Sequence, residues 1–385
     1  MKNFDELMLF TPGPVNVPPR VLAAGAQPML HHRTSEFSRI LVGVVEKTQL
    51  LIGTKQDVLL VHSSGRGAME GTILNLFSPG DEVIAITNGK FGEMFAEIAT
   101  IHGLTVHSIC TDWLLPLQLA EVEQALQSYP QAKAITVCQC ETTTAVINDL
   151  QGIATLAKQY GTLTIVDAIS SAGSLPIEFD DWGLDVFITA SQKGLMCPTG
   201  ISLVVLSLAA WAIVDQATLP KYYIRFRDIQ KNLRSKQETP GSTPVSLVAS
   251  LNEALAMIMD EGKESVYQRH ELVARAIRAG VEAMGLSLFP EQADHRSPGL
   301  SAFTAPAGLS SSLIRKELKA GFGIVAAEGL GNAYKDTVVR VGHIGYVYPK
   351  DALTLVAALE ATMLKLGFVK EPGAGVAACI RVLVE

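Results

Sequence analysis

Short apolar runs alternate with amphipathic segments over the first two thirds of the chain. Each run is bounded by turn residues, which is typical of a buried strand. Between them, apolar residues recur at helical spacing, as in 91–102, where Gly103 ends the pattern. This alternation predicts an α/β domain with a mostly parallel sheet. The predicted strands are 58–62, 83–86, 105–109, 134–137, 163–167 and 185–190.

The last third of the chain has a different pattern. Helices are predicted over 245–261 and 263–283, with Gly262 between them. Shorter strands and two helices then follow, which indicates a smaller C-terminal α+β domain. Residues 9–20 contain four prolines and are predicted to be an arm or loop without regular structure. The expected division is an N-terminal arm (1–20), a large domain (21–262) and a small domain (263–385).

Composition narrows the classes of function. The 385 residues carry a formal net charge of −7 and no basic stripe, which argues against a nucleic-acid partner. The longest apolar run, 201–214, is too short for a membrane span and is predicted to be a strand followed by a helix. Asp5 and Glu6 stand where a signal peptide requires basic residues, so a cytoplasmic location is expected.

The five cysteines do not form a disulfide pattern. Cys138 and Cys140 flank one residue on a predicted strand and would share a face. No second Cys/His pair stands at ligand spacing, so no metal site is expected.

Two charged residues follow neighbouring predicted strands. Asp167 ends the run 163–167, and Lys193 follows the run 185–190. Open α/β sheets carry their chemistry at the carboxyl ends of strands. Pyridoxal phosphate requires a lysine for a Schiff base and an acidic partner for its pyridinium nitrogen. From the spacing alone, a strand-end ion pair is an equally good interpretation.

Val166-Asp167-Ala168 and Ser191-Gln192-Lys193-Gly194 resemble the paired motifs of the class V (fold type I) aminotransferases, in particular the alanine/serine–glyoxylate branch. The resemblance spans residues 9 to about 366. It implies the type I fold, with a large α/β domain and a smaller α+β domain. It also implies a pyridoxal 5′-phosphate cofactor held by Lys193, with Asp167 and Gln192 beside it.

The turn between strand 58–62 and the next helix is rich in glycine. Such a turn lets backbone N–H groups converge on an anion, although the signal is weak by itself. Ser64-Gly65-Arg66-Gly67-Ala68-Met69-Glu70 resembles the phosphate cradle of the family. Relatives commonly have Thr or His where this chain has Arg66. That arginine could bind the phosphate or point away from it.

Other motifs occur in the family's order. Phe91 matches an aromatic residue that stacks on the cofactor ring, although its pattern alone predicts a core residue. Thr143 matches a hydroxyl near the cofactor and substrate, or serves as a turn or cap. Gly13, in Thr11-Pro12-Gly13-Pro14, matches a loop on the substrate side.

Arg340 interrupts the apolar run 338–341, where an unpaired guanidinium would be costly. Its planar fork suits a substrate carboxylate, and a salt bridge to a buried acid is the alternative. Arg340 matches the arginine of the family's Arg-x-Gly motif, which binds that carboxylate.

The loop 238–244 resembles a segment that reaches the cofactor phosphate of a partner subunit, which implies a homodimer with shared active sites. Ser242 is the favoured hydroxyl, and Thr243 remains possible.

The resemblance implies transfer of an amino group from a small amino acid of the serine or alanine type to a 2-oxo acid, glyoxylate or pyruvate. A phosphonate or pyridoxamine transaminase is an alternative. So is a non-catalytic subunit of a larger complex. A cysteine desulfurase fits poorly, because Cys379 is the only cysteine after Cys197 and lies beyond Arg340.

Overall fold

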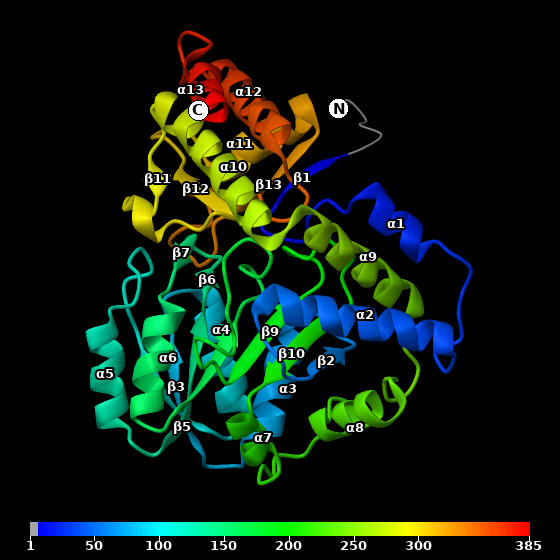
Figure 1. The fold of residues 1–385 in the computed structure, drawn as a ribbon. Coiled ribbons are helices and arrows are strands. Elements are labelled where there is room, and N and C mark those ends of the chain that lie inside the picture. Colours follow the sequence, from blue (N-terminus) through cyan, green and yellow to red (C-terminus); the bar gives the residue numbers. More distant parts are fainter. Residues whose placement is uncertain (1–6) are drawn as a thin grey trace.

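A computed structural model describes residues 7–385, which form two sheets with helices packed around each (Figure 1). Asp5 and Glu6, on which the expected location depended, lie outside the described residues. In Figure 1 the seven-stranded sheet and its helices form the lower part, and the five-stranded sheet lies above it.

The seven-stranded sheet confirms the predicted mostly parallel arrangement. Only β10 runs antiparallel to its two neighbours, β2 and β9. The order of its strands is β2 (Val58–Val61), β10 (Ser202–Leu206), β9 (Val186–Ala190), β8 (Leu163–Asp167), β5 (Ala132–Cys138), β3 (Glu82–Ile86) and β4 (Thr105–Ile109). The central strands are buried on both faces, as the continuous apolar runs predicted.

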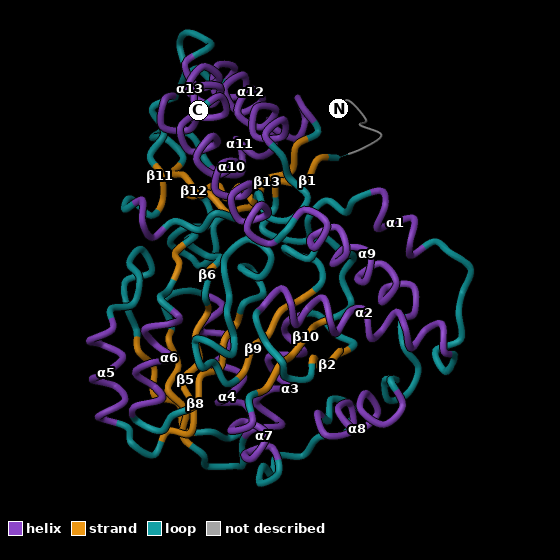
Figure 2. The backbone as a smooth tube through the Cα atoms, in the orientation of Figure 1, coloured by secondary structure: helices purple, strands orange, loops and turns teal. Residues whose placement is uncertain are grey.

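Helices cover both faces of this sheet (Figure 2). One apolar cluster joins the sheet to α2 (Ser35–Ile52), α5 (Leu119–Ser128), α6 (Leu150–Gln159) and α9 (Val245–Glu261). A second cluster joins the opposite face to α3 (Gly65–Leu76), α4 (Lys90–Ile101), α7 (Leu208–Val214) and α8 (Phe226–Lys236). The two faces alternate along each strand, so Val166 belongs to the first cluster and Ile165 to the second.

The five-stranded sheet has its own core. Its strand order is β1 (Met8–Phe10), β13 (Ile324–Glu328), β14 (Val338–Gly342), β12 (Leu300–Thr304) and β11 (Leu288–Phe289). An apolar cluster packs it against α10 (Lys263–Ala283), α11 (Ser311–Phe322), α12 (Pro349–Lys365) and α13 (Ala374–Val384). Gly262 separates α9 from α10, as expected from the sequence.

The prediction that residues 9–20 lack regular structure is wrong at both ends. Leu9 and Phe10 belong to β1, which pairs in parallel with β13, and Phe10 is buried. At the other end, α1 (Pro19–Gly25) begins on a proline, which a first helical position tolerates because its missing N–H has no partner there anyway. Only the stretch between these elements is a loop.

Cys138 and Cys140 do not share one strand, contrary to the prediction. Cys138 ends β5, whereas Cys140 begins β6 (Cys140–Glu141), which pairs with β7 (Val146–Ile147). Within residues 7–385, no cluster of three or more His, Cys, Asp or Glu side chains could hold a metal ion. None of the helices in this part of the chain combines the length and apolarity that crossing a membrane requires.

Candidate active site

Lys193 lies in the turn after β9, close to the carboxyl ends of the parallel strands. Its Nζ donates to the carbonyl oxygen of Pro12 at 2.5 Å and contacts Ser170 Oγ at 3.4 Å. Among the described residues, no carboxylate lies within ion-pair distance of Lys193, so the alternative of a direct ion pair with Asp167 is not what the fold contains.

Burial governs the chemistry of this amine. Loss of solvent, helped by the charge of Arg340 and opposed by that of Asp167, lowers the pKa of Lys193 to about 8. A lysine with this pKa is still mostly charged at pH 7 and becomes mainly uncharged above about pH 8, whereas an exposed lysine stays charged well beyond that pH. Lys193 can therefore act both as a nucleophile and as a proton carrier.

Asp167 ends β8 and is almost completely buried. Its Oδ1 accepts the N–H of Ile169 at 2.7 Å, and its Oδ2 lies 3.7 Å from the Cys138 sulfur. Burial raises the pKa of Asp167 to about 6, against the opposing effects of the Ile169 hydrogen bond and of Lys193. The carboxyl group is thus ionised above about pH 6 and keeps a negative charge inside the protein.

Arg340 lies in the middle of β14 with its side chain buried. Nη1 donates to the carbonyl of Thr142 at 2.7 Å, and Nε donates to the carbonyl of Glu328 at 2.6 Å. Loss of solvent lowers the pKa of Arg340 to about 10, so it stays charged at neutral pH. Within the described part of the chain it has no ion-pair partner, and the predicted alternative of a salt bridge is absent.

The loop 11–14 closes over Lys193. Gly13 has a φ of +135°, and a Cβ there would stand 2.4 Å from Lys193 Cδ. Gly342 of β14 is the glycine of the Arg-x-Gly motif, and a Cβ on it would stand 2.2 Å from the Thr11 carbonyl oxygen. The loop therefore reaches the lysine only because both positions lack a side chain.

Glu141 is a buried carboxylate that the sequence analysis did not single out. Its Oε1 accepts the N–H and the hydroxyl of Thr143, at 2.9 and 2.6 Å. Its Oε2 accepts the N–H groups of Phe91 and Gly92, at 3.1 and 3.2 Å, in the first turn of α4. One carboxylate thus fixes Phe91 and Thr143 relative to each other, helped by the helix dipole.

The predicted phosphate turn lies at the start of α3. Ser64 is the N-cap residue and is exposed, as is Arg66. Gly65 is buried, and a Cβ there would stand 2.4 Å from Cδ1 of Ile169, two residues after Asp167. The turn is therefore packed directly against the Asp167 segment. The first N–H groups of a helix have no intrahelical acceptor and are available to an anion.

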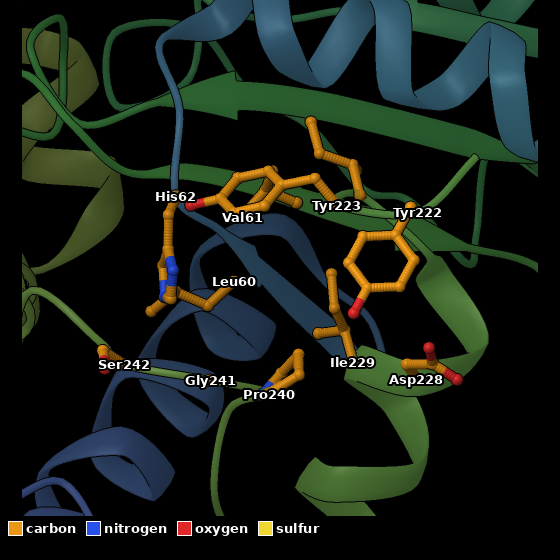
Figure 3. Close-up of a pocket in the computed structure, with 11 residues that line it drawn as sticks. Leu60, Val61, His62, Tyr222, Tyr223, Asp228, Ile229, Pro240, Gly241 and Ser242 are labelled. Carbon is orange, nitrogen blue, oxygen red and sulfur yellow. The ribbon is translucent and has the colours of Figure 1, made fainter.

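Gln192 and Ser242 differ in their surroundings. Gln192 precedes Lys193, and its backbone carbonyl accepts the N–H of Val15, while its side-chain oxygen is buried without a partner. Ser242 makes no hydrogen bond to Lys193, Asp167 or Arg340 in the described residues. Figure 3 shows Ser242 beside His62 at a cavity of about 330 Å³, with Tyr222 on the opposite side.

Thr142 and Ser170 also escaped the sequence analysis. Thr142 Oγ1 donates to Ser170 Oγ at 2.8 Å, and its carbonyl accepts from Arg340, so it connects the surroundings of the lysine and the arginine. The run of three threonines after Glu141 was a signal for a polar, buried turn. Nothing in the local pattern indicated that Pro12 would supply the carbonyl at Lys193.

A comparison with known proteins identifies the family to which this arrangement belongs. Residues 8–343 match the family described as Aminotransferase class-V.

The chain belongs to the class-V aminotransferase family.

Two relatives of this aminotransferase show how far sequence identity extends along the chain. It is 40% identical over 383 residues to a protein from Synechococcus named soluble hydrogenase, small subunit, covering 98% of this chain and 99% of that one. It is 33% identical over 375 residues to the L-aspartate–glyoxylate aminotransferase of Paracoccus denitrificans, covering 96% and 94%.

Solved structures agree on the fold. The ureidoglycine–glyoxylate aminotransferase of Bacillus subtilis superposes with a TM-score of 0.93 at 25% identity, with complete coverage of both chains. The pyridoxamine–pyruvate aminotransferase of Mesorhizobium loti gives a TM-score of 0.92 at 28% identity, covering 100% of this aminotransferase and 98% of the other chain. The predicted fold-type-I architecture is confirmed.

Proposed function

We propose that this aminotransferase uses pyridoxal 5′-phosphate to move the amino group of a small amino acid, of the serine or alanine type, to glyoxylate or pyruvate. The supporting observation is the group of Lys193, Asp167 and Arg340. It provides an amine with a lowered pKa, a buried carboxylate and a buried guanidinium that has no ionic partner among the described residues. The acceptor rests on the glyoxylate and pyruvate named in the relatives.

The residues present fit this cofactor. The start of α3 offers free N–H groups to a phosphate, with Ser64, Gly65 and Arg66 beside them. Two buried polar atoms have no hydrogen-bond partner in the described structure: Ser63 Oγ, next to Ser64, and Gln192 Oε1, next to Lys193. Buried polar atoms are normally satisfied, so their presence favours a bound polar group.

Each residue then has a defined task. When bound, pyridoxal phosphate supplies an aldehyde that condenses with amines and a ring that accepts an electron pair. Lys193 holds the cofactor and moves the proton at the substrate Cα through its Nζ. Asp167 stabilises a proton on the ring nitrogen. Arg340 binds the substrate carboxylate through its remaining N–H donors, while Gly13 lets the loop 11–14 shield Lys193 from water.

Phe91 and Thr143 complete the proposed cofactor site. Phe91 stands at the start of α4, where its ring can cover one face of the cofactor. The Thr143 hydroxyl donates to Glu141 and accepts the Lys90 N–H, so it can offer cofactor or substrate its one remaining acceptor position. Glu141 fixes both positions. Ring stacking needs a fixed distance, which a buried carboxylate with four donors provides.

An amino-donor panel tests the proposal. Purified protein loaded with pyridoxal phosphate is mixed with serine, alanine, aspartate or pyridoxamine, and the cofactor absorbance is followed in single turnover. Glyoxylate or pyruvate is then added. We expect bleaching with serine or alanine and recovery with glyoxylate or pyruvate. Failure of every amino acid to change the spectrum would exclude an aminotransferase of this specificity.

The same panel separates the alternatives. Bleaching by pyridoxamine alone would indicate the pyridoxamine-type reaction, for which the Mesorhizobium loti enzyme is the structural precedent. A spectrum insensitive to every donor would favour a non-catalytic subunit of a larger complex; the Synechococcus relative carries the name of a hydrogenase subunit. The presence of Lys193, Asp167 and Arg340 in one site argues for catalysis.

The homodimer is also part of this proposal. Tyr222 and Tyr223 are 89% and 74% exposed beside Ser242, an unusual position for large aromatic side chains in a monomer. A mixture of Lys193→Ala and Ser242→Ala chains tests shared sites, since a mixed dimer would contain one intact site if Ser242 acts across the interface. Sedimentation would show whether the protein is dimeric at all.

We further propose the division into residues 1–20, 21–262 and 263–385, and a cytoplasmic location. Separate sheets and apolar cores support the two larger units, although β1 attaches residues 8–10 to the second sheet. Limited proteolysis near Gly262 would test the boundary. Cell fractionation would test the location.

A further inference from the structure

Cys138 and Asp167 lie side by side at the ends of two neighbouring parallel strands. β5 and β8 pair in a register that sets Cys138 opposite Asp167, so the two side chains point to the same face of the sheet. The Cys138 sulfur lies 3.7 Å from Asp167 Oδ2, and both residues are buried. An ionised carboxylate can only accept hydrogen bonds, so the thiol is the donor.

We propose that Cys138 is a positioning residue for the transamination reaction, because its S–H group donates to Asp167 Oδ2 and sets how strongly that carboxylate holds a proton. This inference rests on the proposed role of Asp167 as the partner of the ring nitrogen. Cys138 acts through Asp167 and needs no contact with substrate or cofactor.

The two oxygens of Asp167 are not equivalent. Oδ1 accepts the strong N–H donor of Ile169 at 2.7 Å, whereas the Cys138 thiol is the one donor to Oδ2 among the described residues. A thiol is a weak donor, so Oδ2 keeps more of its capacity to accept another proton. A hydroxyl at position 138 would compete more strongly for Oδ2, and an aliphatic side chain would not compete at all.

The charges around the pair favour a neutral thiol. Burial raises the pKa of Cys138 well above its ordinary value, and the negative charges of Asp167 and Glu141 act in the same direction. Glu141, on β6, also raises the pKa of Asp167, while Lys193, after β9, lowers it. The proton therefore stays on sulfur throughout the working pH range, and Cys138 remains a donor.

Two isosteric variants of the full-length protein test the donor. Cys138→Val removes the donor, and Cys138→Thr has the same shape as the valine variant and restores a donor, so the comparison of the two isolates the hydrogen bond from the change in packing. In cofactor-free protein carrying ¹³C-labelled aspartate, the Asp167 carboxyl resonance is identified by its loss in Asp167→Asn. We expect Val to raise the pKa of Asp167 by less than about one unit, because two or three backbone N–H bonds together lower a carboxyl pKa by about two and a thiol is a weaker donor.

Cys138→Thr should return the pKa of Asp167 to the wild-type value or below it. Identical titrations in the Val and Thr variants would overturn the proposal, because the effect would then come from packing. An unchanged titration in Cys138→Val would overturn it as well. In protein loaded with pyridoxal phosphate, the pH at which the cofactor spectrum changes should differ between the two variants in the same order.

Cys197 provides a matched control. Its thiol is also buried and donates to a neutral acceptor, the carbonyl of Leu247, at 3.8 Å. In infrared spectra, the S–H band that disappears in Cys138→Val should move to lower frequency as Asp167 ionises. The band that disappears in Cys197→Val should not respond. A Cys138 band that is insensitive to pH would contradict the hydrogen bond.

The outcome for Cys138 is separable from that for the proposed function. Wild-type turnover by Asp167→Asn would remove the role of Asp167 in transamination. The carboxyl titration and the S–H band do not depend on turnover, so they still decide whether Cys138 controls Asp167. If Asp167→Asn turns over slowly while the pKa of Asp167 is unchanged in Cys138→Val, the inference about Cys138 is wrong and the proposed function stands.

Discussion

Arg340 and Thr142 are 198 residues apart in the sequence, yet the Nη1 atom of the arginine donates to the threonine carbonyl at 2.7 Å. The guanidinium reaches from the five-stranded sheet to the turn after β6. Its second contact, to the Glu328 carbonyl, is also to a neutral group. Backbone dipoles thus hold the guanidinium in place without neutralising it, and its full charge remains for a carboxylate.

Arg340→Ala should mainly impair donors that carry a carboxylate. Losing one partner of a desolvated charged pair costs about 2–5 kcal/mol, which lowers kcat/KM roughly 30- to 5000-fold. Arg340→Lys should recover little, because an ammonium cannot reproduce the fork. Steady-state kinetics with serine and alanine measure the effect.

A simple amine without a carboxylate is the control for Arg340. It should react with the loaded wild type and with Arg340→Ala at nearly the same rate. If the amine is slowed as much as the amino acid, Arg340 is a structural residue and the substrate site lies elsewhere.

Lys193→Ala should abolish turnover and leave the fold intact. Among the described residues, the hydrogen-bond partners of its amine are the Pro12 carbonyl and Ser170, which are both neutral, so its removal breaks no ion pair. Circular dichroism should be unchanged, and mass spectrometry after borohydride reduction should no longer find cofactor attached to the chain. Normal turnover without an added amine would eliminate the assignment.

Asp167→Asn should still load the cofactor but slow proton removal from the substrate by several orders of magnitude. A neutral amide no longer favours a protonated ring nitrogen, so the electron pair left at Cα is less well stabilised. Single-turnover absorbance measures the step. A change of less than about tenfold, or roughly 1.4 kcal/mol of barrier, is too small for the proposed role.

Gly342→Ala should displace the loop 11–14 from Lys193. Its Cβ would stand 2.2 Å from the Thr11 carbonyl oxygen, so the backbone must move, and overpacking of this kind costs about 1–3 kcal/mol. The midpoint temperature of thermal unfolding and the value of kcat/KM should both be lower than in the wild type. Gly321→Ala is the control: this glycine of α11 is exposed, and apart from the adjoining backbone of its own helix no heavy atom of the described residues lies within 4 Å of the added Cβ. Because Gly321 is the last residue but one of the helix, Ala should leave stability unchanged or raise it by less than about 1 kcal/mol.

The loading of cofactor-free protein should depend on pH through Lys193. Because burial lowers the pKa of this lysine to about 8, the reactive uncharged amine becomes the major form above pH 8. The rate of pyridoxal phosphate attachment should rise with pH and reach half its plateau near pH 8. A rate still rising steeply at pH 10 would mean that Lys193 titrates like an exposed lysine.

The sequence determined most of the regular structure. Helices 245–261 and 263–283 match α9 and α10 residue for residue, because their apolar periodicity is long and glycine separates them. The sequence was less informative where paired strands are far apart in the chain. β1 has three residues and β13 has five, and the two strands pair although more than 300 residues separate them. Local periodicity contains no information about such a partner.

The same distinction applies to the site. Asp167, Lys193 and Arg340 could be proposed from the sequence, because a charge at a strand end or inside an apolar run is conspicuous in one dimension. Their environment came only from the tertiary structure. The Pro12 carbonyl at Lys193, the Thr142 carbonyl at Arg340 and the Cys138 thiol at Asp167 are contacts between segments far apart in the chain. The pKa values of these groups depend on their burial and on their distances to other groups, and so does the number of N–H donors that remain unused. Burial and these distances are fixed only when the sheets pack together.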